Sequence, residues 1–247
     1  MRNLHKLYYK DYFSDVDFLN LGSDSSKRAV LRSNQILTAQ VQLSDLIIPD
    51  LGKDLTELDM QVLYPGLVTG IGIQHEASIE NEFKLGLHLD YTTGLPVIYG
   101  SSVKGVLKSY FDSLYGGNDV ERLMDDIFSG KCYHDNTQDK SIYDRDIFYD
   151  AVIKRPNRHN KILESDSFAP HGTGDLRYPL VEPTPITFVK IASGVEILFR
   201  FKLVDTKDRN GRIIMSKSEK KELFKQILTT FGIGAKTNVG YGQLKAI

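Results

Sequence analysis

Residues 94–105 read Gly94-Leu95-Pro96-Val97-Ile98-Tyr99-Gly100-Ser101-Ser102-Val103-Lys104-Gly105, and this stretch decides the expected fold. The apolar run before Gly100 is typical of a short strand, and the apolar residues after it recur at helical spacing. We therefore predict a strand that turns directly into a helix, which Gly116-Gly117 ends.

The first turn of this predicted helix favours an anion. Its first four N–H groups have no partner inside the helix, and the helix dipole adds partial positive charge there. A phosphate is the natural ligand of such a turn. The expected cradle consists of Gly100, Ser101, Ser102, Lys104 and Lys108. The structural alternative, a tight turn capped by Ser101 or Ser102, stays open at this point.

A second glycine-rich segment follows the last predicted helix. That helix opens with a capping box, Ser216 with Glu219, and stops at Gly232. The segment 232–242 holds more glycine than a helix stop needs, which favours close approach to another chain or a ligand. Its Ala235-Lys236-Thr237 lacks the glycine of a Walker A loop and follows a helix instead of preceding one. Binding of ATP is therefore not expected.

The remaining patterns complete an α+β protein. The sequence predicts a strand at 61–73 that is broken by Pro65 and several glycines, and further strands at 83–89, 147–153 and 243–247. It also predicts a hairpin of 186–191 with 195–204. Reduced to its core, the order predicts a ferredoxin-like (RRM-type) β-α-β-β-α-β fold with insertions, two helices lying on one face of the sheet.

The flanking segments define the expected domains. Helical spacing near residues 4–13 and 26–46 predicts a helical N-terminal extension over residues 1–58. A single domain follows over residues 59–247. Within it, residues 162–184 are rich in proline and have little periodicity, so they are expected to form a long loop.

Composition narrows the function classes. A formal net charge of −1 excludes a uniformly basic surface, so any nucleic-acid-binding surface is a local patch. The single Cys132 and the absence of metal-ligand spacing among the histidines argue against a metal site, and no cofactor is expected. The chain shows neither an apolar leader nor a run of about 20 apolar residues. We therefore expect a cytoplasmic protein without a membrane partner.

Two polar segments are further candidates. The basic turn 154–161 follows a predicted strand, so Arg155 and Arg158 could contact RNA phosphate or a neighbouring subunit, or could simply be solvated. Asp166, His171 and Asp175 share the long predicted loop and could support metal-free acid–base chemistry on RNA. An ordinary polar loop is the alternative.

Taken together, the two glycine-rich elements resemble the RAMP superfamily (repeat-associated mysterious proteins) of CRISPR effector complexes. Residues 94–105 are similar to its G-x-P-x-I-P-G-S-S-x-K-G signature, with Tyr99 where proline is common. The segment 232–242 is similar to its C-terminal glycine loop. The order and separation of these two elements make the resemblance specific.

Within that superfamily, three shorter segments resemble the sixth subunit of type III-B (Cmr) complexes. They are Asp150-Ala151, residues 166–171 and residues 183–186. Val152 and Gly172 stand where aromatic residues are common in that subunit, and the resemblance does not extend to the first 50 residues.

The resemblance implies a subunit at one end of a helical backbone that binds the 3′ region of CRISPR RNA. Complementary target RNA and the other RAMP subunits of the Cmr complex are the implied partners. RNA contact carries over to Gly100, Ser101, Ser102, Lys104, Lys236 and Asn238, and also to His75 and His171. No catalytic role carries over, because a different subunit cuts target RNA in that family.

Two rival functions use the same fold. One is an endoribonuclease that processes the guide with histidine acid–base residues. The other is a backbone subunit that cuts target RNA with one of its own aspartates.

Overall fold

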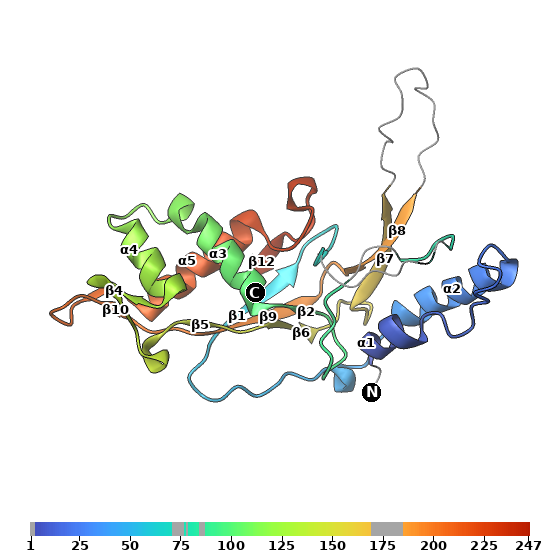
Figure 1. Cartoon of the computed structure of the whole chain (residues 1–247), viewed down its shortest axis with the longest axis horizontal. Coiled ribbons are helices and arrows are strands. Elements are labelled where there is room, and N and C mark those ends of the chain that lie inside the picture. Colours follow the sequence, from blue (N-terminus) through green and yellow to red (C-terminus); the bar gives the residue numbers. More distant parts are fainter. Residues whose placement is uncertain (1–2, 71–76, 78, 84–86, 169–184) are drawn as a thin grey trace, which may run out of the picture.

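A computed structural model describes residues 3–70, 77, 79–83, 87–168 and 185–247, and its centre is an antiparallel sheet (Figure 1). The strand order is β12-β1-β9-β6-β2, and β5 also pairs with β9. The strands of this sheet are β1 (Thr56–Val62), β2 (Val97–Ile98), β5 (Ile147–Phe148), β6 (Ala151–Arg155), β9 (Glu196–Lys202) and β12 (Leu244–Ala246).

Two amphipathic helices, α3 (Gly100–Leu114) and α5 (Lys217–Phe231), cover one face of the sheet (Figure 1). Both predicted helices are confirmed, and α5 has the expected capping box and ends at Gly232. The helices pack together through the stacked rings of Tyr110 and Phe231, whose centroids are 3.9 Å apart. The chain is therefore a mixed α/β protein with an antiparallel sheet. Its main elements occur along the chain in the order β1, α3, β6, β9, α5 and β12, with smaller elements and the pair β7–β8 between them.

The alternation of apolar residues along the strands builds the core between the sheet and the helices. In β1, Leu58, Met60 and Val62 are buried, and the polar residues between them lie on the opposite face. In β9, Phe199 and Phe201 are fully buried on the helix side. Such burial of large apolar side chains is the main favourable term in folding.

Smaller elements lie at both ends of the sheet. The left end of the molecule in Figure 1, where α5 begins, contains α4 (Val120–Met124), η3 (Asp125–Ser129), β3 (Lys131–Cys132), β4 (Asp135–Asp139), η4 (Ile142–Asp144), β10 (Thr206–Lys207) and β11 (Ile213–Met215). At the opposite end lie the paired strands β7 (Leu163–Phe168) and β8 (Ile186–Ile191), and η5 (Thr237–Val239) follows α5.

Three strand predictions need correction. The hairpin of 186–191 with 195–204 is wrong, because β8 pairs with β7 while β9 joins the central sheet. The predicted strand 61–73 overlaps β1 only at Gln61 and Val62, because β1 begins at Thr56 and ends at Val62. Residues 71–73 lie outside the described residues. The start of the expected loop 162–184 is strand β7, and residues 169–184 lie outside the described residues.

The predicted strand 83–89 is represented only by an isolated bridge between Leu89 and Pro96, and residues 84–86 lie outside the described part of the chain. The prediction over 147–153 holds in two pieces, β5 and β6, interrupted at Tyr149 and Asp150. The last strand is confirmed as β12.

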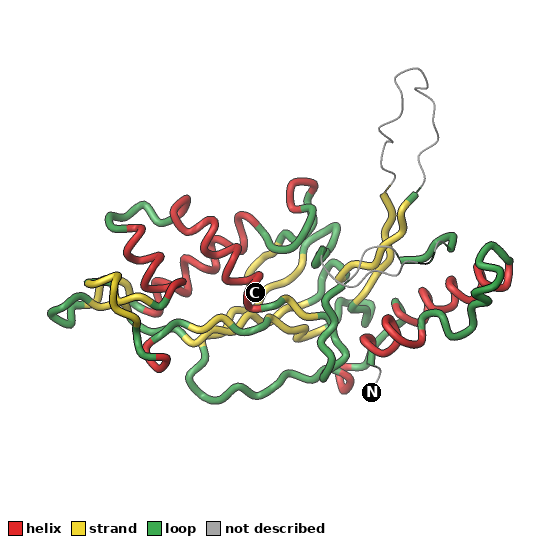
Figure 2. The backbone as a smooth tube through the Cα atoms, viewed as in Figure 1, coloured by secondary structure: helices red, strands yellow, loops and turns green. Residues whose placement is uncertain are grey.

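The N-terminal residues contain α1 (Leu4–Lys6), η1 (Leu7–Asp11), α2 (Asp24–Leu37) and η2 (Leu43–Asp45). Helix α2 ends nine residues before the predicted limit of 46, because the chain turns away at Thr38 and the Val41 N–H donates to the Asn160 carbonyl at 2.7 Å. Residues 46–55 then run as an irregular segment beneath the sheet, on the face opposite the helices (Figure 2). Among the described residues no helix is both long and apolar enough to cross a bilayer.

Candidate nucleic-acid interface

The first turn of α3 is less open than the sequence predicts. The N–H of Gly100 donates to Asp150 Oδ1 at 2.6 Å, and the N–H groups of Ser102 and Val103 donate to the carbonyl of Tyr99 at 2.8 and 3.0 Å. The cap is Tyr99, so the alternative of a turn capped by a serine side chain is wrong. A Cβ at position 100 would clash with the carbonyl of Phe148, which explains the glycine.

The cations of this turn are available to a ligand. Lys104 is half-buried and Lys108 is exposed on the outer side of α3. Neither side chain forms an ion pair or hydrogen bond with any residue in the described part of the chain. The anion-binding capacity of the turn therefore rests more on these two lysines and the Ser101 backbone than on the N–H of Gly100.

The glycines of segment 232–242 allow a close approach, but the partner is the chain itself. Val68 forms an isolated bridge with Ala235, and the Gly242 N–H donates to the Gly66 carbonyl at 2.8 Å. A Cβ on Gly234 (φ +100°) would clash with the carbonyl of Val68. These glycines therefore pack two segments of backbone against each other, a role that the sequence alone did not separate from ligand binding.

The two glycine-rich elements meet at one pocket. It has a volume of about 230 Å³ and lies between residues 67–70, the first turns of α3 and residues 233–235. Ser102 lines it from the helix and Gly234 from the segment that follows α5. We refer to it as the loop–helix pocket. The structure thus brings together two elements that are more than 120 residues apart in the sequence.

Lys236 lies on the other side of the glycine-rich segment, against β7. Its Nζ is 3.9 Å from the centre of the Phe168 ring, which is a cation–π contact. Nearby, Asp166 Oδ2 accepts hydrogen bonds from Tyr241 Oη at 2.8 Å and from Lys190 Nζ at 2.6 Å. An exposed Asn238 follows in η5.

These contacts determine the protonation state of the Asp166 carboxyl. Burial raises the pKa of its carboxyl, but the hydrogen bonds from Lys190 and Tyr241 outweigh this and hold the pKa below its usual range. Burial and the neighbouring carboxylate raise the pKa of Tyr241 to about 12. At neutral pH Asp166 is therefore an ionised carboxylate already engaged by two donors, which suits a fixed link between β7, β8 and the glycine-rich segment.

The basic turn 154–161 continues from the same end of the sheet. Lys154 Nζ lies 2.7 Å from both Asp59 oxygens, and Arg155 pairs with Glu196 at 3.7 Å. Arg158 is exposed and contacts the neighbouring His159 ring. Part of the charge of this turn is thus neutralised within the fold, and Arg158 is its most available cation.

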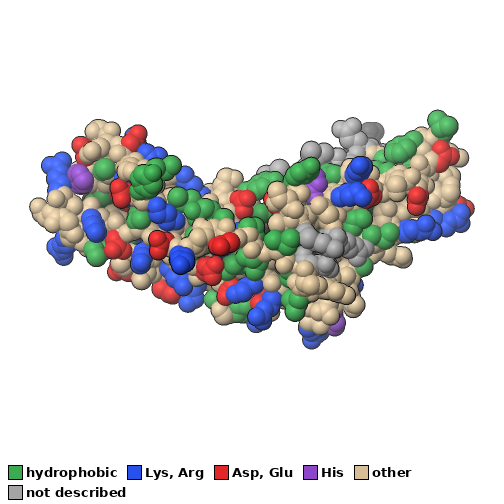
Figure 3. Space-filling model, turned by 90° about the horizontal axis from the view of Figure 1, so that it is seen from below, with side chains coloured by type: hydrophobic (Ala, Val, Ile, Leu, Met, Phe, Trp, Pro, Cys, Tyr) green, Lys and Arg blue, Asp and Glu red, His purple; other side chains and the backbone are tan. Residues whose placement is uncertain are grey.

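The face of the sheet opposite the helices carries both signs of charge. Figure 3 shows this underside, where Lys and Arg side chains are interspersed with Asp and Glu. A mixed face lacks the positive footprint that a phosphate backbone requires. The lysines of α3, unpaired in the described part of the chain, lie on the other side of the sheet from this mixed-charge face.

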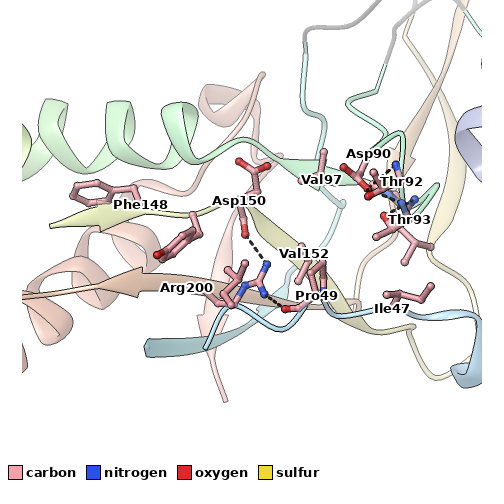
Figure 4. Close-up of a pocket in the computed structure, with 14 residues that line it drawn as sticks. Ile47, Pro49, Asp90, Thr92, Thr93, Val97, Phe148, Asp150, Val152 and Arg200 are labelled. Carbon is pink, nitrogen blue, oxygen red and sulfur yellow. Dashed lines mark hydrogen bonds between the residues drawn. The ribbon is translucent and has the colours of Figure 1, made fainter. Parts of the chain in front are cut away.

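Sequence reasoning missed one cation on that face. Arg200 of β9 is only 3% exposed and lines a pocket of about 290 Å³ (Figure 4). Its guanidinium donates to the carbonyl of Pro49 at 2.6 Å and to that of Asp150 at 3.4 Å. Burial lowers the pKa of Arg200, although nearby carboxylates oppose this. The alternation along β9 places Arg200 on this face but gives no sign of its burial.

Comparison with known proteins adds a family to this geometry. The family model for RAMPs, the RAMP superfamily, matches residues 59–245. The chain belongs to the RAMP superfamily. This RAMP chain is also 27% identical over 159 residues to the CRISPR system CMR subunit Cmr6 of Saccharolobus solfataricus. That match covers 64% of this chain and 48% of the relative, so the RAMP chain spans about half the length of the protein it matches.

Two solved structures resemble the RAMP chain. A chain of the type III-B Cmr-beta complex bound to cognate target RNA, determined by cryo-EM, superposes with a TM-score of 0.55 at 20% identity. The match covers 78% of this chain and 58% of that one, and it shows a shared fold. The crystal structure of Cmr6 from Pyrococcus furiosus superposes with a TM-score of 0.37 at 20% identity, covering 78% of this chain and 97% of that one.

Two predicted contacts of the RAMP chain cannot be placed. His75 and His171 lie outside the described residues, as does Asp175. In the described part of the chain, no group of three or more His, Cys, Asp or Glu side chains is arranged to hold a metal ion.

Proposed function

We propose that this chain is a non-catalytic RNA-binding subunit of a type III-B CRISPR (Cmr) complex that holds the 3′ region of the guide RNA. Its RAMP membership and its similarity to Cmr6 support the class of complex. CRISPR RNA, complementary target RNA and other RAMP subunits are the proposed partners. The order of β1, α3, β6, β9, α5 and β12 supports a ferredoxin-like core.

One observation carries the proposal. Two glycine-rich elements flank the loop–helix pocket, and unpaired Lys104 and Lys108 follow on the helix that forms one wall. Lysines without a carboxylate partner in the described chain are free to neutralise phosphates, and such contacts are independent of base sequence. The paired state of Asp166 supports a binding role over acid–base chemistry on RNA.

The test is guide retention in the assembled complex. We expect Lys104→Ala with Lys108→Ala to lower the amount of guide RNA retained and to make the remaining binding less dependent on salt concentration, while the chain still assembles. Lys207→Ala removes an exposed lysine from the far end of the molecule and serves as the matched control. Unchanged guide retention in the double variant would contradict the proposal.

The same preparation tests the endoribonuclease alternative. Cleavage of a guide precursor by the purified chain, lost in His171→Ala, would show that the chain is an enzyme. We expect no such cleavage and no effect of that substitution on RNA integrity.

A further inference from the structure

The loop–helix pocket has one aromatic wall. Tyr99 and His88 form it, with ring centroids 4.3 Å apart and planes inclined by 40°. Tyr99 remains 42% exposed, so part of its ring is open to a ligand. Aromatic side chains of this kind stack on unpaired bases, which present a flat face whatever their identity.

Other parts of the pocket lining are backbone and small side chains. Gly70, Gly234 and Ala235 bring no bulk into the space, while Leu67 and Ile233 give it an apolar floor. A flat ligand stacked on the exposed part of the tyrosine ring would therefore meet backbone and small side chains elsewhere in the lining, which favours a planar ring over a branched aliphatic group.

The polar groups of the pocket are neutral. Burial lowers the pKa of His88, which keeps its imidazole uncharged at neutral pH. The hydroxyl of Ser102 and the ring nitrogens of His88 have no hydrogen-bond partner within the described residues. Thr69 Oγ1 accepts a hydrogen bond from the backbone N–H of His88 at 3.0 Å, and its hydroxyl proton remains available to donate. Such neutral donors and acceptors suit the edge of a base, whereas the charge of a phosphate is better neutralised by the lysines of α3 outside the pocket.

The size of the pocket selects a small ligand. Its 230 Å³ lies below the range of about 300–1,000 Å³ typical of sites for drug-sized molecules. A single base fits this space better than a whole nucleotide. The lysines of α3 lie outside the pocket lining, where the attached phosphates would remain in solvent.

From these features we infer that the loop–helix pocket binds one unpaired base of the RNA, stacked on Tyr99. The inference rests on the proposed function, because it assumes that RNA passes α3. It goes beyond that function by assigning a contact to a base at one position of the RNA, whereas the lysines contact the backbone. Any of the four bases can occupy the site, since stacking on tyrosine is tolerant of sequence.

Photo-cross-linking in the assembled complex tests this inference. Guides that carry 4-thiouridine at one position at a time are irradiated, and adducts on this chain are mapped by mass spectrometry. We expect one guide position to give an adduct on the peptides that contain His88 or Tyr99. Tyr99→Phe should keep the adduct, and Tyr99→Ala should reduce its yield about tenfold, in line with the loss of one stacked base.

Matched controls separate this site from a general effect on folding. Tyr143→Ala removes a more exposed ring, 78% exposed, at the other end of the molecule, and it should leave the adduct unchanged. Equal melting temperatures of the Tyr99 variants and the parent chain would exclude a folding defect.

The outcomes distinguish the two proposals. Adducts that map only elsewhere on this chain would overturn the base-binding pocket and leave the RNA-binding function standing. The absence of adducts on this chain at every guide position would overturn both. Equal yields from Tyr99→Phe and Tyr99→Ala would overturn the stacking role of Tyr99.

Discussion

Two lysine–aspartate pairs of almost the same length lie at opposite ends of the molecule. At the end that carries β10 and β11, Lys220 Nζ and Asp146 Oδ2 are 2.7 Å apart, and both side chains are completely buried. At the glycine-rich end, Lys190 Nζ and Asp166 Oδ2 are 2.6 Å apart, and the side chains are 8% and 29% exposed.

The surroundings give the pairs different roles. Lys220 also donates to the Val204 carbonyl, and Asp146 accepts a hydrogen bond from the Val204 N–H. Both members of this pair therefore bond to the same backbone residue inside the core. Burial raises the pKa of Asp146 and lowers that of Lys220, and each partner's charge opposes the shift of the other. Asp166 is shared with Tyr241 of the glycine-rich segment. The first pair lies within the core, and the second links β7 and β8 to the glycine-rich segment.

The largest effect is expected at the buried pair. Lys220→Met should lower the free energy of unfolding by about 3–5 kcal/mol, because it leaves the Asp146 carboxylate buried without its partner. Urea unfolding measures this loss. Lys225→Met, on the same helix in an exposed pair with Glu222, should change stability by less than about 1 kcal/mol. Equal losses in the two variants would remove the contrast between the ends.

The second effect concerns the backbone of the glycine-rich end. Gly234→Ala should cost about 2–4 kcal/mol, because the methyl group meets the Val68 carbonyl at a positive φ. Gly211→Ala is the matched control, since its φ is +78° but nothing lies within 4 Å of the added carbon. Thermal unfolding should show a loss of only about 1 kcal/mol there. A similar loss at both positions would mean that backbone strain, and not close packing, accounts for the effect.

A smaller, pH-dependent effect is expected at the partly buried pair of Lys190 and Asp166. The pKa of Asp166 is lower in the folded chain than in the unfolded chain, so its stabilisation is present above the unfolded value of about 3.9 and is lost as the pH falls through the folded value. Asp166→Asn should cost about 1–2 kcal/mol at pH 7. The gap from the parent chain should close on acidification.

Denaturant unfolding over a pH series checks this prediction. Tyr241→Phe removes only the hydroxyl donor, so it should cost less than Asp166→Asn at pH 7. A gap between parent and Asp166→Asn that widens toward acid would reverse the assigned direction of the pKa.

The smallest effect on the fold is expected from Lys108. Lys108→Gln should leave the free energy of unfolding within about 0.5 kcal/mol, because the side chain is exposed and unpaired in the described chain. In single-stranded RNA binding, the slope of log affinity against log salt should shrink by about 0.7. Lys207→Gln, at the far end, should leave that slope unchanged.

Helices α3 and α5 could be predicted from the sequence because their signals are local. The capping box at Ser216 and the apolar period after Gly100 each lie within one turn or a few turns of helix. The true start of β1 had an equally local signal, since Leu58, Met60 and Val62 alternate with polar residues. The apolar residues that follow, such as Leu67 and Val68, extended the predicted strand past its end at Val62 in spite of the interrupting Pro65 and glycines.

Pairing between strands could not be read in the same way. Ile186–Ile191 and the strand after it are separated by only Ala192, Ser193, Gly194 and Val195, which is a typical hairpin spacing. β8 nevertheless pairs with β7, whose sequence Leu163–Phe168 is mostly polar and carries little strand signal. The choice between two partners depends on tertiary contacts.

The candidate site was predictable in its parts and not in its assembly. The sequence identified both glycine-rich elements, and the loop–helix pocket shows them side by side. The sequence could not show that the N–H of Gly100 donates a hydrogen bond to Asp150, because that bond joins residues 50 positions apart. The link from Tyr241 to Asp166 is also long-range, across 75 positions. His75 and His171 stay predictions.

The hydrogen bond from Arg200 to Pro49 limits how far the N-terminal part of this chain can be removed in a shortened protein. The segment that matches the RAMP model starts at residue 59, ten residues after Pro49. A chain shortened to that start would lose the carbonyl that receives a guanidinium only 3% exposed, together with the first strand residues from Thr56. Family boundaries in sequence and the smallest stable unit therefore differ here, and a truncated protein should retain the residues from Leu46 onward.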